Sequence, residues 1–258
     1  MNPGRLSRWA SRILLVTAAA ALLIVSGRAA WRLREAAELA RVSEPMQHSP
    51  DHARMRLLIV GDSTAVGTGA SSAQGSVAGL LAREFPHLLI ENRARDGAKF
   101  AEVVDQLGGN ARFDLVLVQA GGNDVIRLRG LDALRGDIER VTVLARQHAD
   151  RVVLMPAGNV GNAPFFLAPL SWLMTWRSRR LHTFVQEAAS RHGAAYVNLF
   201  HERGADPFVA QPELNAGDGL HPSDAGYRVW FNELLLQAEL ARLLAAARDP
   251  TRSTTSSS

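Results

Sequence analysis

The chain has 258 residues, a formal net charge of +4, 47% hydrophobic residues and 21% charged residues. These values are close to globular averages and exclude both a disordered chain and a protein with many membrane spans. The basic residues are scattered arginines without the signature of a nucleic-acid-binding motif, so we expect no nucleic-acid partner. The absence of cysteine excludes disulfides, a thiolate nucleophile and cysteine-ligated metals.

The N-terminus has the layout of an export signal. An apolar run extends from Ile13 to Val25, and three arginines precede it: Arg5, Arg8 and Arg12. We assign residues 1–30 to a signal sequence or a membrane anchor, which predicts an exported or membrane-anchored protein, extracytoplasmic or periplasmic. Three further arginines follow the run and leave the orientation open: Arg28, Arg32 and Arg34. The alternative, a buried amphipathic helix, fits less well because the run is apolar on all sides.

Residues 31–53 are expected to form a helical stalk or linker. Arg, Glu, Ala and Leu alternate as far as Val42, and Pro45 and Pro50 then interrupt the pattern. At the other end of the chain, residues 248–258 are rich in Ser and Thr and are expected to be disordered.

Between these segments, residues 54–247 alternate short apolar runs with longer helical patterns. The runs predict strands at Leu57 to Val60, Leu88 to Glu91, Leu115 to Gln119, Val152 to Met155 and Ala195 to Leu199. The helical patterns lie at Ser76 to Phe85, Phe100 to Leu107, Leu131 to Ala149, Ser171 to Arg191 and Asp224 to Ala247. This order predicts one three-layer α/β/α domain with a five-stranded parallel sheet, whose ligands bind at the carboxyl ends of the strands.

A candidate nucleophile follows the first strand. Ser63, in Gly61-Asp62-Ser63-Thr64, occupies a strand-to-helix turn. There its hydroxyl is exposed at the edge of the sheet, and its backbone N–H lies near a helix start, where positive potential favours an oxyanion. Capping a turn is the ordinary alternative for Ser63 or Thr64.

Two further elements stand where they could complete such a site. Asn123, in Gly121-Gly122-Asn123-Asp124 after the third strand, can donate its amide to an oxyanion, although Gly-Asn-Asp is also common in turns. Asp218 and His221 precede the last helix, and a tight loop can bring His221 to the serine with Asp218 fixing its tautomer. An Asp-x-x-His pair can also be half of a metal site, but the other histidines supply no second spaced ligand pair, so no metal is predicted.

Taken in order, the three elements resemble the SGNH (GDSL-like) hydrolase family over roughly residues 56 to 245. Thr64 replaces the leucine of the usual GDSL wording, a change outside the chemistry. The α/β-hydrolase elbow Gly-x-Ser-x-Gly is absent, which favours a flavodoxin-like layout. The resemblance implies a serine esterase in which Ser63, His221 and Asp218 form a catalytic triad. It also implies oxyanion donors at Ser63, Asn123 and a second glycine, for which Gly97 is the best candidate, with Gly108 and Gly109 nearby. No cofactor is implied.

An apolar segment from Gly158 to Trp176 bears on the substrate. It is followed by three arginines, Arg177, Arg179 and Arg180, and it could lie at a membrane interface or wall an acyl pocket; packing of a helix start into the core is the alternative. With the N-terminal segment, it favours a lipid-like or acyl ester as the small-molecule substrate. An O-acyl transferase or carbohydrate O-deacetylase with the same triad, and a non-catalytic membrane-tethered binding module, remain open.

Overall fold

The domain is built on a parallel sheet of five strands in the order β2-β1-β3-β4-β5. The strands are β1 (Met55–Gly61), β2 (Leu88–Asn92), β3 (Leu115–Gln119), β4 (Arg151–Leu154) and β5 (Ala195–Tyr196). This computed structural model describes residues 9, 17, 23, 26–28 and 30–246. The predicted α/β/α class with five parallel strands is confirmed.

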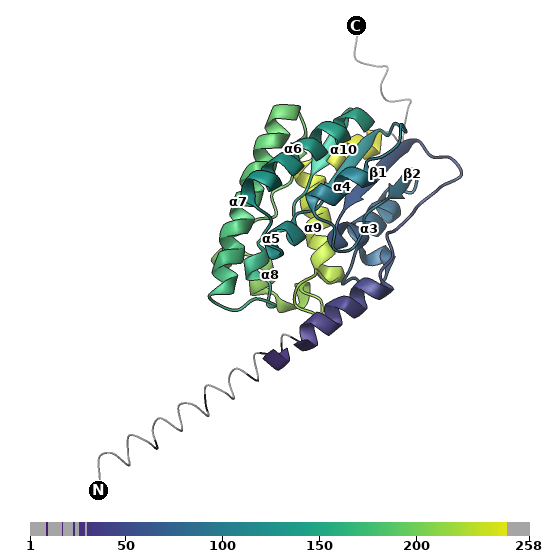
Figure 1. The fold of residues 1–258 in the computed structure, drawn as a ribbon. Coiled ribbons are helices and arrows are strands. Elements are labelled where there is room, and N and C mark those ends of the chain that lie inside the picture. The colour runs from purple at the N-terminus through teal and green to yellow at the C-terminus, as the bar shows by residue number, and fades with distance from the viewer. Residues whose placement is uncertain (1–8, 10–16, 18–22, 24–25, 29, 247–258) are drawn as a thin grey trace.

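Helices cover both faces of the sheet (Figure 1). They are α2 (Ser63–Val66), α3 (Val77–Glu84), α4 (Phe100–Gln106), α5 (Gly122–Ile126), α6 (Leu131–His148), α7 (Leu170–His192), α8 (Pro207–Ala210), α9 (Asp224–Gln237) and α10 (Leu240–Ala246). Alternate residues of β1 divide between two apolar clusters: Leu58 packs with α4, α6 and α7, and Leu57 packs with α3, α9 and α10. Such strands are buried on both faces, which explains why they read as unbroken apolar runs.

The last strand is shorter than predicted. β5 pairs with β4 only at Ala195 and Tyr196, whereas the apolar run predicts a strand as far as Leu199. At Asn198 the side chain of Gln237 takes over the backbone hydrogen bonds, accepting from Asn198 N at 2.8 Å and donating to Asn198 O at 3.1 Å. Since these backbone groups bond to α9, they no longer extend the sheet.

The last helix is broken where a continuous one was predicted. Between α9 and α10, Glu239 adopts a left-handed φ of 51°. The chain turns there, and Leu240 and Leu244 become buried in the cluster with α3 and α9. The prediction of one helix from Asp224 to Ala247 was therefore wrong, because burial of these two leucines requires a change of direction. Ala247 and residues 248–258 lie outside the described residues.

The segment assigned to a stalk begins as a helix that packs against the domain. We call residues 30–42 the N-terminal helix; in Figure 1 it is the purple helix beneath the domain. Arg32 is buried in this contact. Beyond the helix, His48 pairs with Ile90 of β2 through two backbone hydrogen bonds of 3.1 and 2.8 Å. The segment is thus held to the domain at both of its ends.

Most of the predicted export or anchor segment, residues 1–30, lies outside the described residues. Within the part that the structure describes, no helix has the length and apolarity that a membrane crossing requires. Membrane attachment therefore stays a prediction.

Candidate active site

Ser63 stands at the carboxyl end of β1, at the first residue of α2. Gly61 makes this sharp exit possible, because its φ is +153° and a side chain there would collide with the carbonyl of Gln119 on β3. Asp62 then caps α2 by accepting hydrogen bonds from Thr64 N at 2.9 Å and Thr64 Oγ1 at 2.7 Å. The threonine that departs from the usual GDSL wording therefore helps to hold the turn that carries the serine.

The three predicted triad residues meet. His221 Nε2 lies 2.9 Å from Ser63 Oγ, and His221 Nδ1 lies 2.6 Å from Asp218 Oδ2. The other carboxylate oxygen, Asp218 Oδ1, accepts from the backbone N–H groups of Leu220 and His221. Asp218 is fully buried, while the His221 side chain is 11% exposed. A carboxylate fixed in this way keeps a proton on Nδ1 and leaves Nε2 free to accept one from the serine.

Hydrogen bonds between distant segments bring the loop of His221 to Ser63. On α9, Tyr227 is fully buried and donates to Thr68 O at 2.7 Å. At the start of the same helix, the Asp224 carboxylate accepts from Ser71 N and Ser71 Oγ at 2.7 and 2.5 Å. Thr68 and Ser71 follow α2 directly, so these bonds tie the segment after the serine to the segment after the histidine.

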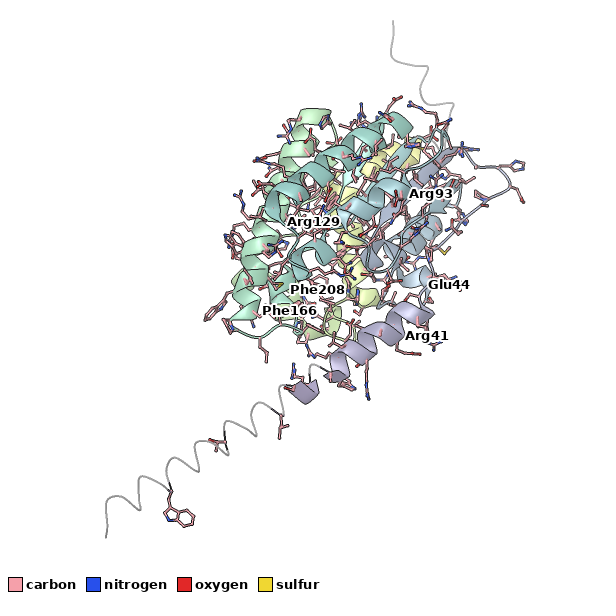
Figure 2. All side chains as sticks on the ribbon, viewed as in Figure 1. Arg41, Glu44, Arg93, Arg129, Phe166 and Phe208 are labelled. Carbon is pink, nitrogen blue, oxygen red and sulfur yellow. The ribbon has the colours of Figure 1, made fainter. Side chains whose placement is uncertain are left out.

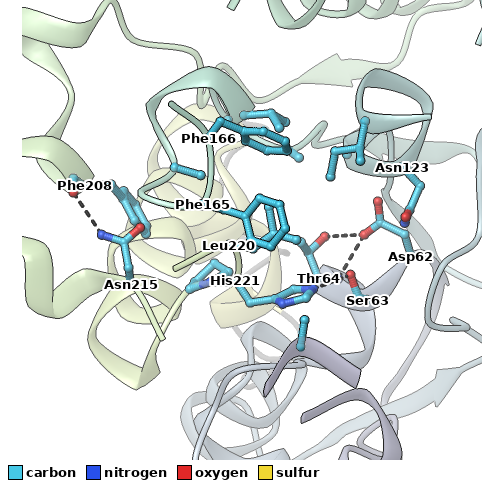
Figure 3. A pocket seen from close by; sticks show the side chains of 18 of the residues that line it. Asp62, Ser63, Thr64, Asn123, Phe165, Phe166, Phe208, Asn215, Leu220 and His221 are labelled. Carbon is cyan, nitrogen blue, oxygen red and sulfur yellow. Dashed lines mark hydrogen bonds between the residues drawn. The ribbon is translucent and has the colours of Figure 1, made fainter. Parts of the chain in front are cut away.

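Asn123 and Gly97, the two oxyanion donors predicted in addition to the Ser63 N–H, line the same cavity as Ser63 and His221. Figure 3 shows Asn123, Asp62 and Ser63 together at one end of this cavity. Gly97 has a φ of +76° in the turn between β2 and α4. Sequence analysis placed both residues here. It named Arg177 only as an arginine after the apolar segment, whereas Arg177 is buried on α7. Its guanidinium donates to the carbonyls of Asp124, Val125 and Arg129 and so holds the end of α5.

Asp62, Asp124 and Asp218 are buried carboxyl groups near Ser63 and His221, and the pKa of each is shifted by its surroundings. Burial raises the pKa of Asp218, but hydrogen bonds and charge from His221, with two backbone amides, together lower it. Burial raises the pKa of Asp62 in spite of its bonds to Thr64. Burial, together with repulsion from Asp62, also raises the pKa of Asp124 to about 7, although Phe100 N donates to it at 3.0 Å. Of these three groups, Asp218, beside the imidazole, is therefore the one whose surroundings favour the charged carboxylate.

The cavity has a volume of about 420 Å³, and most of its lining surface is apolar. In Figure 3, Phe165 and Phe166 lie between the serine end and an opposite end marked by Phe208 and Asn215. Phe165 and Phe166 belong to the apolar segment that sequence analysis linked to the substrate. The N-terminal helix also lines the cavity, with Leu33, Ala36, Ala37 and Ala40. Sequence reasoning missed this contribution; the i, i+3, i+4, i+7 spacing of these apolar residues is the signal that could have indicated it.

The five-stranded parallel sheet with its covering helices is the α/β fold of solved SGNH hydrolases. The chain belongs to the GDSL-like lipase/acylhydrolase family, because the model of that family matches residues 59–229, more than half of the chain. This confirms the predicted family, which is one of serine ester hydrolases.

Individual relatives agree with this family. A GDSL-like esterase of Mycobacterium tuberculosis is 28% identical over 194 residues, covering 70% of this chain and 61% of its own length. The chain thus spans about three fifths of that relative. Among solved structures, TesA is 23% identical with a TM-score of 0.56, covering 71% of this chain and 99% of its own. An acetylxylan esterase from Geobacillus stearothermophilus is 20% identical with a TM-score of 0.52, covering 74% and 96%. Both structural likenesses concern the fold alone.

The raised pKa of Asp124 predicts a pH dependence of stability. Between pH 3.8 and about 7 the native carboxyl holds a proton that the unfolded chain has released. Its contribution to stability is therefore fully present below the unfolded pKa and is lost as the pH rises through 7. We expect the free energy of unfolding of the wild type, relative to Asp124→Asn, to fall as the pH rises from 4 to 8.

Urea unfolding of both proteins across this pH range measures the difference. Asp105→Asn, at an exposed position on α4, controls for the loss of a carboxylate. Parallel stability profiles for wild type and Asp124→Asn would contradict the shifted titration.

Proposed function

We propose that this protein is a serine esterase that hydrolyses lipid-like or acyl esters through an acyl-enzyme. The observation that carries the proposal is the unbroken chain of contacts from Ser63 Oγ to His221 and from His221 to buried Asp218. A nucleophile, a base within hydrogen-bond reach and a group that orients the base are the three parts that nucleophilic catalysis requires.

In the first half of the reaction, Ser63 Oγ attacks the carbonyl carbon of the ester while its proton passes to His221 Nε2. Asp218 accepts the hydrogen bond from Nδ1 and stabilises the imidazolium that forms. The carbonyl oxygen becomes an oxyanion, and the Ser63 N–H, the Gly97 N–H and the Asn123 amide are its proposed donors. His221 then gives its proton to the departing alkoxide, which leaves Ser63 acylated.

In the second half, a water molecule takes the place of the alcohol. His221 Nε2 accepts a proton from the water, whose oxygen attacks the acyl carbon and forms a second oxyanion in the same position. Collapse of this intermediate breaks the bond to Ser63 Oγ, and His221 returns the proton to the serine. The carboxylic acid leaves, and the residues of the site are restored.

Two features support an apolar acyl group as the substrate. The cavity is walled by apolar side chains such as Phe165, Phe166 and Leu220 on the way from the serine. Outside it, at and just before the start of α7, five large apolar side chains are exposed: Leu167, Leu170, Trp172, Leu173 and Trp176. Aromatic and aliphatic groups of this kind insert into the boundary of a lipid surface. We therefore propose that the exposed group contacts lipid, with residues 1–30 as the membrane attachment.

Removal of either reacting group tests the mechanism. We expect Ser63→Ala and His221→Ala to lower kcat/KM on p-nitrophenyl esters by at least about a thousandfold, because both act in the same step. Ser63→Ala should also lose labelling by a fluorophosphonate probe. Ser72→Ala and His52→Ala, at exposed positions, are the matched controls. Near-normal turnover by either triad variant would contradict the mechanism, and an unlabelled wild type would favour a binding module.

Asn123 provides a separate test of oxyanion stabilisation. We expect Asn123→Ala to lower kcat by about 100- to 1000-fold with little change in KM, because the amide bonds more strongly to the transition state than to the substrate. Steady-state kinetics on a soluble ester measure both constants, with exposed Asn110→Ala as the control. A change confined to KM would assign Asn123 to substrate binding instead.

A substrate panel tests the proposed acyl specificity. We expect medium-chain p-nitrophenyl esters to have a higher kcat/KM than the acetate ester or acetylated xylo-oligosaccharides, because longer chains bury more apolar surface in the cavity. Analysis of products with added alcohols separates hydrolysis from acyl transfer. A preference for the acetylated sugar would instead indicate a carbohydrate deacetylase.

A further inference from the structure

The N-terminal helix lies in a segment that the sequence predicts to be a stalk or linker. It lies before residue 59, where the match to the family begins, and yet four of its side chains line the cavity that holds Ser63 and His221. These four are Leu33, Ala36, Ala37 and Ala40, which fall on one face of the helix. In Figure 3 its purple ribbon lies below Ser63 and His221 in the view.

The first attachment of this helix is to the loop that carries the acid and the base. Arg32 is 8% exposed, and its guanidinium lies against Gly219, where an added Cβ would come within 2.6 Å of Nη1. The charge of Asp218 attracts this guanidinium. One turn further along, the Glu35 carboxylate approaches Gly217 so closely that a side chain there would collide with it. Both glycines flank Asp218, so the helix is seated directly on the catalytic loop.

The second attachment fixes the segment that follows the helix. Gln47 Nε2 donates to Asn92 O at 2.6 Å, and Asn92 N donates to Gln47 Oε1 at 3.0 Å. Asn92 ends β2, and its own side chain donates to Ala65 O of α2, the helix that begins with the serine. The helix therefore contacts the loop that carries His221, and the residues after it are linked through Asn92 to α2, which begins with Ser63.

We propose that the N-terminal helix is a wall of the acyl-binding pocket, and that Ala36 and Ala40 set the length of acyl chain that fits. Both are partly buried, lie on the side of the helix that faces the domain, and line the cavity. Alanine is the smallest side chain that keeps a helix intact, so each leaves space where a larger residue would fill the cavity. Figure 2 shows Phe166 and Phe208, which also line the cavity, at the end of the molecule where the helix lies.

The proposal rests on the proposed esterase activity and adds a residue-level determinant of its specificity. Because the chain contains no cysteine, a single introduced thiol can be modified selectively. The test uses full-length Ala36→Cys and Ala40→Cys, each treated with methyl or decyl methanethiosulfonate. Glu38→Cys is the matched control, since Glu38 lies on the same helix, its side chain is 60% exposed and it does not line the cavity. Turnover of p-nitrophenyl acetate and p-nitrophenyl decanoate is measured before modification, after it, and after reduction.

The decyl group is expected to lower decanoate kcat/KM by about tenfold or more in Ala36→Cys and Ala40→Cys, because it occupies the space of the acyl chain. Acetate turnover should change little, the methyl group should have a smaller effect, and reduction should restore decanoate turnover, which excludes misfolding. An unchanged chain-length profile, or an equal loss for acetate and decanoate, would overturn the proposal. Inactivity of the unmodified wild type on every ester would instead defeat the esterase assignment.

Discussion

One contact governs the rest of the site: the approach of His221 Nε2 to Ser63 Oγ across 158 positions of sequence. The serine is fixed by the end of a central strand, whereas the histidine lies on a loop between two helices and has no strand to position it. Its position depends on α9, which packs against the face of the sheet that carries Leu57. From this helix Tyr227 donates a hydrogen bond to Thr68 O, in the segment after α2. Within the loop, Ala216 N also donates to His221 O at 2.8 Å, so backbone bonds and the packing of α9 together position the histidine.

The buried carboxyl groups show how one small site separates their charge states. Of Asp62, Asp124 and Asp218, Asp218 is the one that contacts the imidazole, and there hydrogen bonds and charge outweigh the cost of burial. Asp62 and Asp124 hold backbone and side-chain donors that shape the turns, and burial raises the pKa of each. Like charges in a poorly solvated region disfavour each other, so an arrangement with one favoured anion costs less than one with three.

The sequence predicted those parts of the structure that local pattern determines. β3 reads as an unbroken apolar run because both faces are covered. The contacts of His221 with Ser63 and with Asp218 were expected because the order of the motifs resembles that of the SGNH hydrolases and because each motif follows a strand or precedes a helix. The early end of β5 depends on Gln237, and the break at Glu239 depends on the burial of distant leucines. The end of β5 and the break at Glu239 thus depend on contacts with residues far away in the sequence, so the local pattern does not predict them. Arg32, which sequence analysis counted among the arginines that follow the apolar run, is buried by contacts with a distant loop.

The N-terminal helix joins the cavity to the part of the chain where we predict membrane attachment. Figure 1 shows this helix and the start of α7, which carries exposed Trp172 and Trp176, at the same end of the molecule. If residues 1–30 hold that end at a bilayer, an acyl chain leaving the lipid would meet apolar side chains before it reaches Ser63. Since the helix also packs against the loop of Asp218, the same short element contacts both the cavity and the loop that holds His221.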